Sequence, residues 1–235
     1  MKKIFIPIKE HSERVPRKNF RDFGGKPLYQ YVISKYIDYD SKGHKIEWDK
    51  FYNDMELWVD TDSDEIKNWV NAECPDNFHA YSRPKQLVGD DVSVNLLIGN
   101  FVYHHCNNDD VIVQTHVTSP FLNPLTICRV SRLRDLSIDS TASANVINSR
   151  LWRRENYGWC PINHNPMKME KTQDLPAVYE ENSAFYAFTV DSFKKNGKRI
   201  GESHRFVEVS FPHNLDIDTE KDFEMALALR ECYEK

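Results

Sequence analysis

Two groups of charged residues, far apart in the chain, have the types and spacing that phosphate chemistry needs. Asp216 and Asp218 are two positions apart, so on an extended segment both carboxylates face one side and can share a divalent cation such as Mg²⁺. The second group lies in one basic segment: Lys9, Arg14, Arg17, Lys18 and Arg21. Because the whole chain carries a formal net charge of −5, this clustering is local and predicts an anion site that would suit a triphosphate. The ordinary alternatives are a solvated basic loop and two solvated acids ahead of a helix.

The elements around these residues are those that position ligands in α/β proteins. The basic segment follows an apolar stretch at 3–8 and continues to Gly24 and Gly25. A loop after a buried strand lies at the carboxyl end of an open sheet, where its N–H groups and cations can bind an anion. At the other end of the chain, Thr219 and Asp222 have capping-box spacing, which predicts that a helix begins just after the acidic pair.

Composition restricts the fold and the partners. A chain of 235 residues, 40% hydrophobic and 29% charged, is long enough for one sizeable α/β domain. Its negative charge argues against nucleic acid as a partner, and no run of about 18 apolar residues indicates a membrane span. The basic and then apolar start is too short for a signal peptide, so we expect a soluble, cytoplasmic protein. The five scattered cysteines, with no Cys-x-x-Cys pair, predict reduced thiols rather than disulfides or a zinc site.

Hydrophobic periodicity predicts alternating strands and helices along the chain. The strands are expected at 3–8, 56–62, 78–81, 110–116 and 143–149, and the helices at 28–37, 63–70, 93–105, 123–136 and after 219. The β-branched run at 110–116 is typical of a central strand covered on both faces. A polar stretch at 40–43 is expected to be an exposed loop.

Two polar groups within these elements favour structural roles. Asp62 belongs to a segment, 61–64, whose residues are typical helix caps, so we expect it to cap the following helix and leave it out of the site. His104 and His105 are adjacent on a helix and therefore point about 100° apart, which favours surface or packing roles over metal binding.

Five segments in order resemble the signature of the acylneuraminate cytidylyltransferases, the family of the CMP-sialic acid synthetases. They are Ser12-x-Arg14-x-Pro16-x-Lys18-Asn19 with 24–28, then 83–93, 118–120, 171–186 and 216–219, and the resemblance covers about residues 3 to 230. The chain departs from the family pattern at four places. Lys9 stands for a common arginine, Arg14 for a small residue, His116 and Val117 for glutamine and proline, and Ser183 for glycine.

The resemblance implies a set of nucleotide and metal ligands. The nucleotide-binding residues it implies are Lys9, Ser12, Arg14, Lys18, Asn19, Arg83 and Ser93. The catalytic residues it implies are Lys9, Lys18, Asp216 and Asp218, of which the two aspartates would also be the Mg²⁺ ligands. Lysine at position 9 keeps the charge but not the planar fork of arginine.

The resemblance also implies where the sugar binds. The residues expected near the sugar are His116, Thr118, Ser119, Lys171, Gln173, Asn182 and Tyr186. His116 can offer a donor and an acceptor, as the family glutamine does, but it is shorter and titrates near neutral pH. Ser183 in place of glycine predicts an unstrained backbone at that position, unless serine tolerates the strain.

We therefore expect an α/β protein with a Rossmann-like three-layer nucleotidyltransferase sheet, folded as one cytidylyltransferase domain over 1–235. The aromatic, turn-rich segment at 152–166 predicts an excursion at about 150–180 that would dimerise and close over the partner's sugar site. The alternative, a long surface loop, would expose a large apolar patch.

The function implied is transfer of a cytidylyl group from CTP to an acidic 2-keto sugar, giving a CMP-sugar and pyrophosphate. Partners would be CTP, the sugar acid, Mg²⁺ and a second copy of the chain. Two alternatives remain at this stage: a glycosyltransferase that uses a nucleotide-sugar, and a nucleotide-binding relative without turnover.

Overall fold

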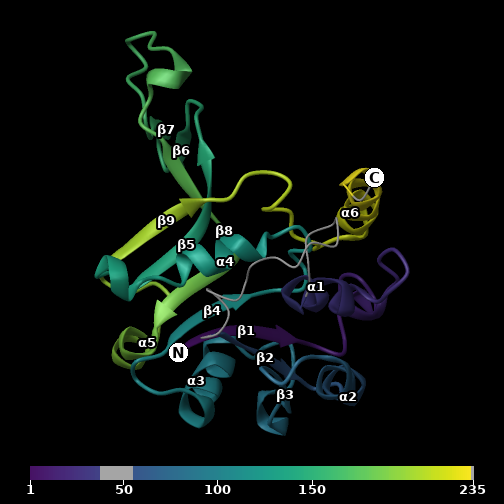
Figure 1. The fold of residues 1–235 in the computed structure, drawn as a ribbon. Helices are drawn as coiled ribbons and strands as arrows, with labels where there is room; N and C mark the ends of the chain where they lie inside the picture. The colour runs from purple at the N-terminus through teal and green to yellow at the C-terminus, as the bar shows by residue number, and fades with distance from the viewer. Residues whose placement is uncertain (38–54, 234–235) are drawn as a thin grey trace.

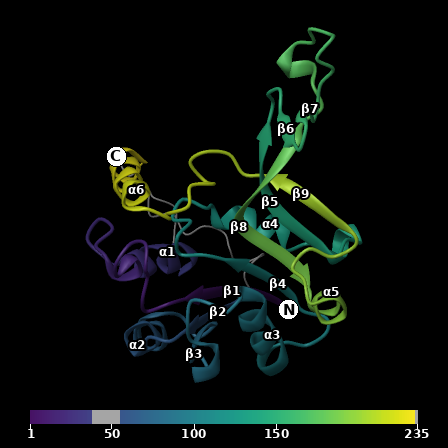
Figure 2. The same cartoon turned by 180° about the vertical axis from the view of Figure 1, so that it is seen from behind.

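A seven-stranded sheet with helices on both faces forms the body of the protein (Figures 1 and 2). The computed structural model describes residues 1–37 and 55–233, so the loop expected at 40–43 lies outside the described residues. The strands are β1 (Lys2–Ile8), β2 (Met55–Thr61), β3 (Phe78–Ser82), β4 (Val111–Thr115), β5 (Ser140–Ile147), β6 (Trp152–Glu155), β7 (Gly158–Pro161), β8 (Val178–Thr189) and β9 (His204–Glu208). The α-helices are α1 (Leu28–Ile37), α2 (Asp64–Glu73), α3 (Val94–His105), α4 (Pro124–Val130), α5 (Val190–Asn196) and α6 (Glu220–Tyr233).

The main sheet has the strand order β3-β2-β1-β4-β8-β5-β9. β1 pairs in parallel with β2 and β4, β2 with β3, and β5 with β9. β8 is antiparallel to both of its neighbours, β4 and β5. The sheet is thus mixed but mostly parallel, and the predicted Rossmann-like three-layer class is confirmed.

The protein has one hydrophobic core on each face of the main sheet, and side chains along β1 point alternately into the two cores. Ile4 and Ile6 face the side that α1, α2, α4 and α6 cover, whereas Phe5 faces the side that α3 and α5 cover. The ring of Phe5 stacks on that of Phe101 in α3, with centroids 4.7 Å apart. Since β1 and β4 are buried on both faces, their sequences are nearly continuous apolar runs.

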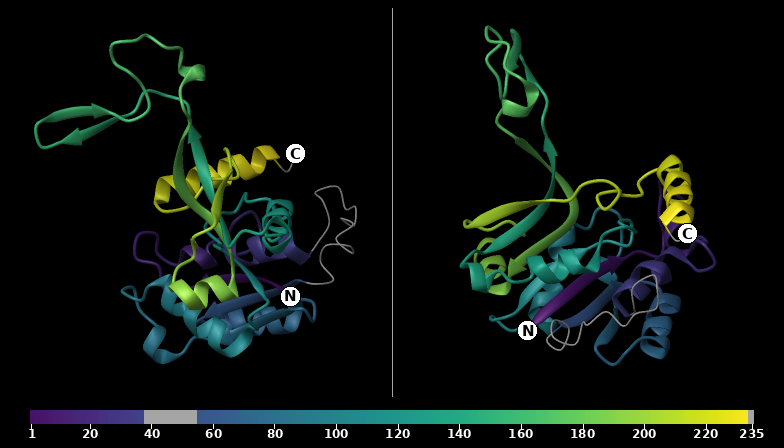
Figure 3. Two further views of the ribbon diagram at one scale, coloured as in Figure 1. Left: turned by 90° about the vertical axis from the view of Figure 1, so that its left-hand side faces the viewer. Right: turned by 45° about the horizontal axis from the view of Figure 1, so that its top comes forward.

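Residues 148–177 leave the body between β5 and β8. The two strands stay paired as far as Ile147 opposite Val178, and beyond them the chain forms an arm with the hairpin β6–β7 and the short helix η5 (Thr172–Asp174). The hairpin projects sideways from the arm in the left view of Figure 3. The arm is the segment in which the sequence predicts an excursion.

One predicted helix is shorter than expected. The periodicity at 123–136 predicts a single helix, but α4 ends at Val130 and only a short turn, η4 (Arg134–Leu136), follows. The hydroxyl of Ser131 donates to the carbonyl of Cys128, which competes with the helical pattern. Ser137 has a φ of 53°, which turns the chain toward β5.

The described part of the chain contains no helix long and apolar enough to cross a bilayer. His105 packs its ring on Trp58, Tyr81 and Phe101, as expected of a packing residue. Cys74, Cys106, Cys160 and Cys232 are free thiols, and Cys128 is buried in the core.

Candidate active site

Most of the predicted site residues of the body follow the carboxyl ends of parallel strands. Lys9 follows β1, Arg83 follows β3, and His116 follows β4, so one edge of the sheet carries all three. The segment 209–219 crosses the same edge, where the N–H of Ile217 donates to the carbonyl of Thr118 over 2.8 Å. This crossing brings Asp216 and Asp218 from the far end of the sequence to the ends of β1 and β4.

Lys18 is the point at which the N-terminal loop meets the acidic pair. Its Nζ donates to the carbonyl of Ile217, between the two aspartates in sequence, over 2.5 Å. Burial lowers the pKa of Lys18, and the charges of Asp216 and Asp218 oppose that lowering. The ammonium group is therefore partly withdrawn from water and lies beside two carboxylates, a setting in which its charge acts at short range.

The two aspartates have different surroundings. Desolvation by the surrounding protein, together with the charge of Asp218, raises the pKa of the Asp216 carboxyl. The hydroxyl of Thr118 is hydrogen-bonded to Asp216 and opposes that rise. Oδ1 of Asp218 pairs with Nη2 of Arg14 at 2.8 Å. Both groups of charges that the sequence singled out thus meet in one place.

These residues fit a magnesium ion. Among the described residues, no group of three or more His, Cys, Asp or Glu side chains is arranged to hold a metal. Two carboxylates suffice for Mg²⁺ at a phosphate site, because that ion is usually held by one or two carboxylates together with substrate phosphates and water.

The first turn of the basic loop is held by Asn19. Its Nδ2 donates to the carbonyl of Lys9 over 2.8 Å, and the side chain is 5% exposed. Oδ1 of Asn19 is buried without a hydrogen-bond partner among the described residues. The Nζ of Lys9 meets Oδ1 of Asp90 at 2.8 Å, and Ser12 lies half-buried on the same loop.

Arg83 is not arranged as a direct phosphate ligand. Its side chain is 1% exposed, and its Nε meets Oδ1 of Asp60 at 2.5 Å. Burial raises the pKa of Asp60, while the charge of Arg83 opposes the rise. The guanidinium also donates to the carbonyls of Ile8 and Asp60, over 3.5 and 3.2 Å, so it holds the ends of β1 and β2. We correct the expectation accordingly: Arg83 stabilises the edge on which the site is built.

The residues expected at the starts of α2 and α3 make no side-chain capping bonds. Asp62 was expected to cap α2, but its Oδ1 accepts the N–H of Glu10 over 2.7 Å, so that expectation was wrong. The N-cap residue of α2, Ser63, makes no side-chain capping bond. Ser93 is the N-cap residue of α3, also without a capping bond, and its exposed side chain faces solvent.

His116 lies at the end of β4, next to the acidic pair. Its Nε2 is 2.7 Å from Nε2 of Gln114. Burial, together with the charges of Arg199 and Lys18, lowers the pKa of His116 to about 4, while Asp218 acts in the opposite direction. The imidazole is therefore neutral at physiological pH. Thr118 and the buried Ser119 follow it in the same turn.

Asn182 and Tyr186 lie on β8, the strand that pairs with β4, and His116 follows the end of β4. Nδ2 of Asn182 donates to Oδ1 of Asn145 over 2.8 Å, and the hydroxyl of Tyr186 is bonded to Glu181 and Ser183. Ser183 has a φ of 58°, so serine does adopt the left-handed backbone for which glycine is usual, at a cost of about 1 kcal/mol.

Lys171 and Gln173 are not brought to this site within one chain. Both are exposed on the arm, at η5. Their predicted contact with the sugar stays a prediction.

Sequence reasoning missed Gln114, Arg199 and Glu181. Gln114 was counted as part of a buried strand, and a polar residue within that β-branched run was the signal available. Arg199 belongs to a run of cations at 194–199 and carried no local signal. All three, including Glu181 with its bond to Tyr186, are identified only through their partners in space.

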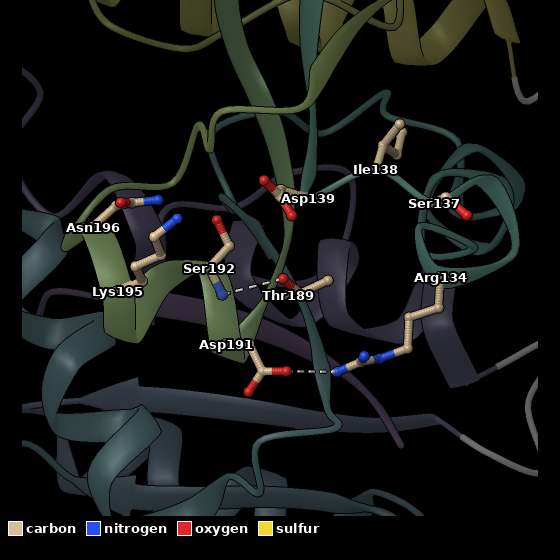
Figure 4. Close-up of a pocket in the computed structure, with 9 residues that line it drawn as sticks. All are labelled: Arg134, Ser137, Ile138, Asp139, Thr189, Asp191, Ser192, Lys195 and Asn196. Atoms are coloured by element: carbon tan, nitrogen blue, oxygen red, sulfur yellow. Dashed lines mark hydrogen bonds and ion pairs between the residues drawn. The ribbon is translucent and has the colours of Figure 1, made fainter.

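A pocket of about 350 Å³ lies at the opposite end of the sheet (Figure 4). Thr189, in its wall, pairs with Val111 at the start of β4, so the pocket is at the amino ends of the parallel strands. Arg134 pairs across it with Asp191 at 3.5 Å. It contains none of the predicted site residues.

Comparison with known proteins gives the family of this chain. A family model described as cytidylyltransferase matches residues 4–234. The pseudaminic acid cytidylyltransferase of Campylobacter jejuni is 25% identical over 95% of this chain and 94% of its own length. The CMP-N,N'-diacetyllegionaminic acid synthase of Legionella pneumophila is 24% identical over 96% of this chain and 94% of its own.

A solved structure has the same fold. The CMP:2-keto-3-deoxy-manno-octonic acid synthetase complexed with CTP superposes with a TM-score of 0.64 and 17% identity, and the match covers 99% of both chains. This chain therefore belongs to the cytidylyltransferase family and is a nucleotidyltransferase.

Proposed function

We propose that the protein transfers the cytidylyl group of CTP to a hydroxyl of an acidic 2-keto sugar, releasing pyrophosphate and forming a CMP-sugar. The observation that carries the proposal is the meeting of Lys18 with the Asp216–Asp218 segment, through the Nζ contact to Ile217, at the carboxyl ends of β1 and β4. This edge is where open α/β sheets bind their ligands.

Lys9, Ser12, Arg14, Lys18 and Asn19 would bind the nucleotide. The buried Oδ1 of Asn19 is an acceptor without a partner in the part of the protein that the structure describes, so it suits an N–H donor such as an amino group of a base. Lys18 and Arg14 would lie against the phosphates, and Arg14 can turn to them because its pairing with Asp218 is solvent-exposed.

The reaction needs no covalent intermediate on the protein. The sugar hydroxyl loses its proton to solvent water and attacks the α-phosphorus, the bond from that phosphorus to the bridging oxygen breaks, and pyrophosphate leaves with the electron pair. Lys9 and Lys18 stabilise the negative charge that develops on the phosphate oxygens and hold the two substrates in line. When bound at Asp216 and Asp218, Mg²⁺ would supply charge neutralisation at the phosphates.

We further propose that the protein is a homodimer joined through its arm. Tyr157, Trp159 and Met167 are 103, 65 and 92% exposed there, a gathering of apolar side chains that is unusual on a monomer. Dimerisation would also bring Lys171 and Gln173 of one arm to the sugar bound by the other chain. A cytoplasmic location is proposed because that compartment supplies CTP.

The acceptor is proposed to be a sugar acid of the kind named for the relatives: pseudaminic acid, a legionaminic acid, a sialic acid, or an eight-carbon 2-keto sugar acid. A cationic site edge with Lys18 and Arg14 suits both a triphosphate and a carboxylate.

A panel of these acids with CTP and Mg²⁺ tests the proposal directly, with pyrophosphate release and the nucleotide product as readouts. We expect pyrophosphate and a CMP-sugar with at least one acid. A protein that releases sugar only from preformed nucleotide-sugars would be a glycosyltransferase. Binding of CTP with no product from any acid would indicate a relative without turnover. Either of these two results overturns the proposal.

A further inference from the structure

Three side chains form a hydrogen-bonded chain that ends at His116. Nη1 of Arg199 donates to Oε1 of Gln114 over 2.8 Å, and Nε2 of Gln114 is 2.7 Å from Nε2 of His116. Gln114 is fully buried in the central strand β4, and His116 is two residues further along, at the site edge. The three groups therefore connect the face covered by α3 and α5 with the substrate edge.

The direction of this chain is fixed by chemistry. A guanidinium only donates hydrogen bonds, so the amide atom that faces Arg199 must be the oxygen. The other end of the amide, Nε2, also lies 3.4 Å from the carbonyl of Thr115, which only accepts. Two independent neighbours thus require Gln114 to present its N–H group to His116.

His116 must then accept at Nε2. An imidazole that accepts at one nitrogen is neutral and carries its proton on the other, Nδ1. The neighbouring cations act in the same direction: burial and the charges of Arg199 and Lys18 lower the pKa of His116, against the charge of Asp218. Within the described residues, Nδ1 has no hydrogen-bond partner in the protein, so its N–H group is available to a ligand.

Arg199 is itself held in place. Its guanidinium carbon lies 3.8 Å from the centre of the Tyr186 ring, and the hydroxyl of Tyr186 is bonded to Ser183 at 2.9 Å and to Glu181. This cation–π contact holds the guanidinium beside β8. The hydroxyl of Ser183 and the carboxylate of Glu181 thus hold the tyrosine ring on which Arg199 rests.

We infer that Arg199 and Gln114 are positioning residues that hold His116 as its Nδ1–H tautomer, so that Nδ1–H donates a hydrogen bond to an oxygen of the acidic sugar. This inference rests on the proposed function and adds a selection rule to it. The glutamine that is usual here in the family offers a donor and an acceptor, whereas the held imidazole offers a donor only. The sugar must therefore present an acceptor oxygen, a hydroxyl, carbonyl or carboxylate, to His116.

The tautomer can be tested in the free enzyme, without substrates. The ¹⁵N shifts and ring couplings of His116 in the histidine-labelled protein, assigned by comparison with His116→Gln, show which nitrogen carries the proton. We expect Nδ1–H in the wild type near pH 7.5. In Gln114→Glu the carboxylate can only accept, so the proton should move to Nε2 or the ring should become charged. A wild-type ring protonated at Nε2, or a ring unaffected by Gln114→Glu, overturns the inference.

Kinetics test the link to the sugar. Arg199→Met removes the donor that orients Gln114, and Gln114→Glu reverses the bond to His116. In each variant the KM for the sugar acid should rise about tenfold, the value of one hydrogen bond to a polar ligand, while the KM for CTP stays unchanged. Lys198→Met is the matched control, since it removes an exposed cation one residue away, and it should change neither constant.

The two proposals fail separately. A wild-type enzyme that releases no pyrophosphate with any sugar acid overturns the proposed function, and the ring shifts still decide the tautomer. An active enzyme whose sugar KM is unchanged in both Arg199→Met and Gln114→Glu overturns the role of these residues and leaves the proposed function in place.

Discussion

Nε of Arg83 lies 2.5 Å from Oδ1 of Asp60, and both side chains are almost completely buried, at 1 and 0% exposed. The hydroxyl of Tyr81 donates to the second carboxylate oxygen over 3.0 Å. A buried ion pair of this kind contributes little over an apolar pair, but removal of one partner leaves an uncompensated charge. The pair joins β2 to the residue that follows β3, and the contact of Arg83 with the carbonyl of Ile8 extends this link to the start of the basic loop.

Arg83→Met should destabilise the protein rather than weaken CTP binding directly. The variant leaves the Asp60 carboxylate buried without its cation, so the free energy of unfolding in urea should fall by about 3–5 kcal/mol. Asp60→Asn combined with Arg83→Met should recover much of the loss. If Arg83→Met unfolds like the wild type but binds CTP about tenfold less well by calorimetry, the residue is a phosphate ligand after all.

Lys18→Met should weaken CTP binding while the apolar stem of the side chain is kept. A charge-assisted contact is worth about 1.5–3 kcal/mol, so we expect an affinity lower by tenfold or more by calorimetry. Lys221→Met removes an exposed cation of α6 and serves as the control, with no change expected. Equal CTP affinity in the wild type and in Lys18→Met would remove Lys18 from the nucleotide site.

His116→Gln should make the protein less sensitive to acid. The pKa of His116 is lowered to about 4 in the folded protein from 6.5, so the unfolded chain binds this proton more readily. Stability from this group is complete above pH 6.5 and is lost as the pH falls toward 4, by about 3 kcal/mol. The glutamine variant lacks this loss.

The comparison uses the difference between the two unfolding curves, measured in urea from pH 7.5 to 4. Asp60 and Asp216 have raised pKa values, which act in the opposite direction, but they are common to both proteins and cancel in the difference. A constant difference across the range would show that His116 titrates normally in the folded state.

Local sequence patterns were sufficient for the residues whose role depends on their own segment. The apolar run of β1, the basic loop after it, and the capping box of Thr219 and Asp222 are each readable from neighbouring residues. The i, i+2 spacing of Asp216 and Asp218 is also a local pattern, and the structure places both aspartates near Lys18, while their role as metal ligands stays a prediction.

Roles that depend on a distant partner could not be read in this way. Arg83 looks like a free cation in the sequence, and only the approach of Asp60 across the sheet shows that it is buried. Gln114 and Arg199 are 85 positions apart, so nothing in either segment indicates the bond between them. The arm is similar: its composition predicts an exposed excursion, but nothing in its sequence shows that Lys171 and Gln173 lie on the arm, away from the other predicted site residues.

Tyr157→Ala combined with Trp159→Ala should convert a dimer to a monomer. Both side chains are exposed at the tip of the β6–β7 hairpin, whereas Trp152 packs on His164 within the arm and would disturb it if changed. Light scattering at micromolar concentration should give twice the chain mass for the wild type. Tyr103→Ala, at an exposed residue of α3, is the control and should remain dimeric. A monomeric wild type, or a dimeric double variant, contradicts the arm interface.

Asp218→Asn should abolish turnover at limiting Mg²⁺ while leaving the fold intact. The amide keeps the shape and one oxygen ligand but removes a full charge beside the phosphates. The pairing with Arg14 that is lost with it is exposed, at 69 and 46% for the two side chains, so the melting temperature should hardly change. Pyrophosphate release measured against Mg²⁺ concentration checks the expectation.

Asp222→Ala is the matched comparison, because this acid is one helical turn further on and serves the helix. Its Oδ2 accepts from the N–H and the hydroxyl of Thr219, over 2.7 and 2.8 Å, and these bonds lower the pKa of Asp222. Loss of the cap should cost about 0.5–2 kcal/mol of stability and leave the Mg²⁺ dependence of turnover as in the wild type. Wild-type turnover by Asp218→Asn at limiting Mg²⁺ would disprove the metal assignment. An inactive Asp222→Ala that melts normally would place the metal site at the start of α6 instead.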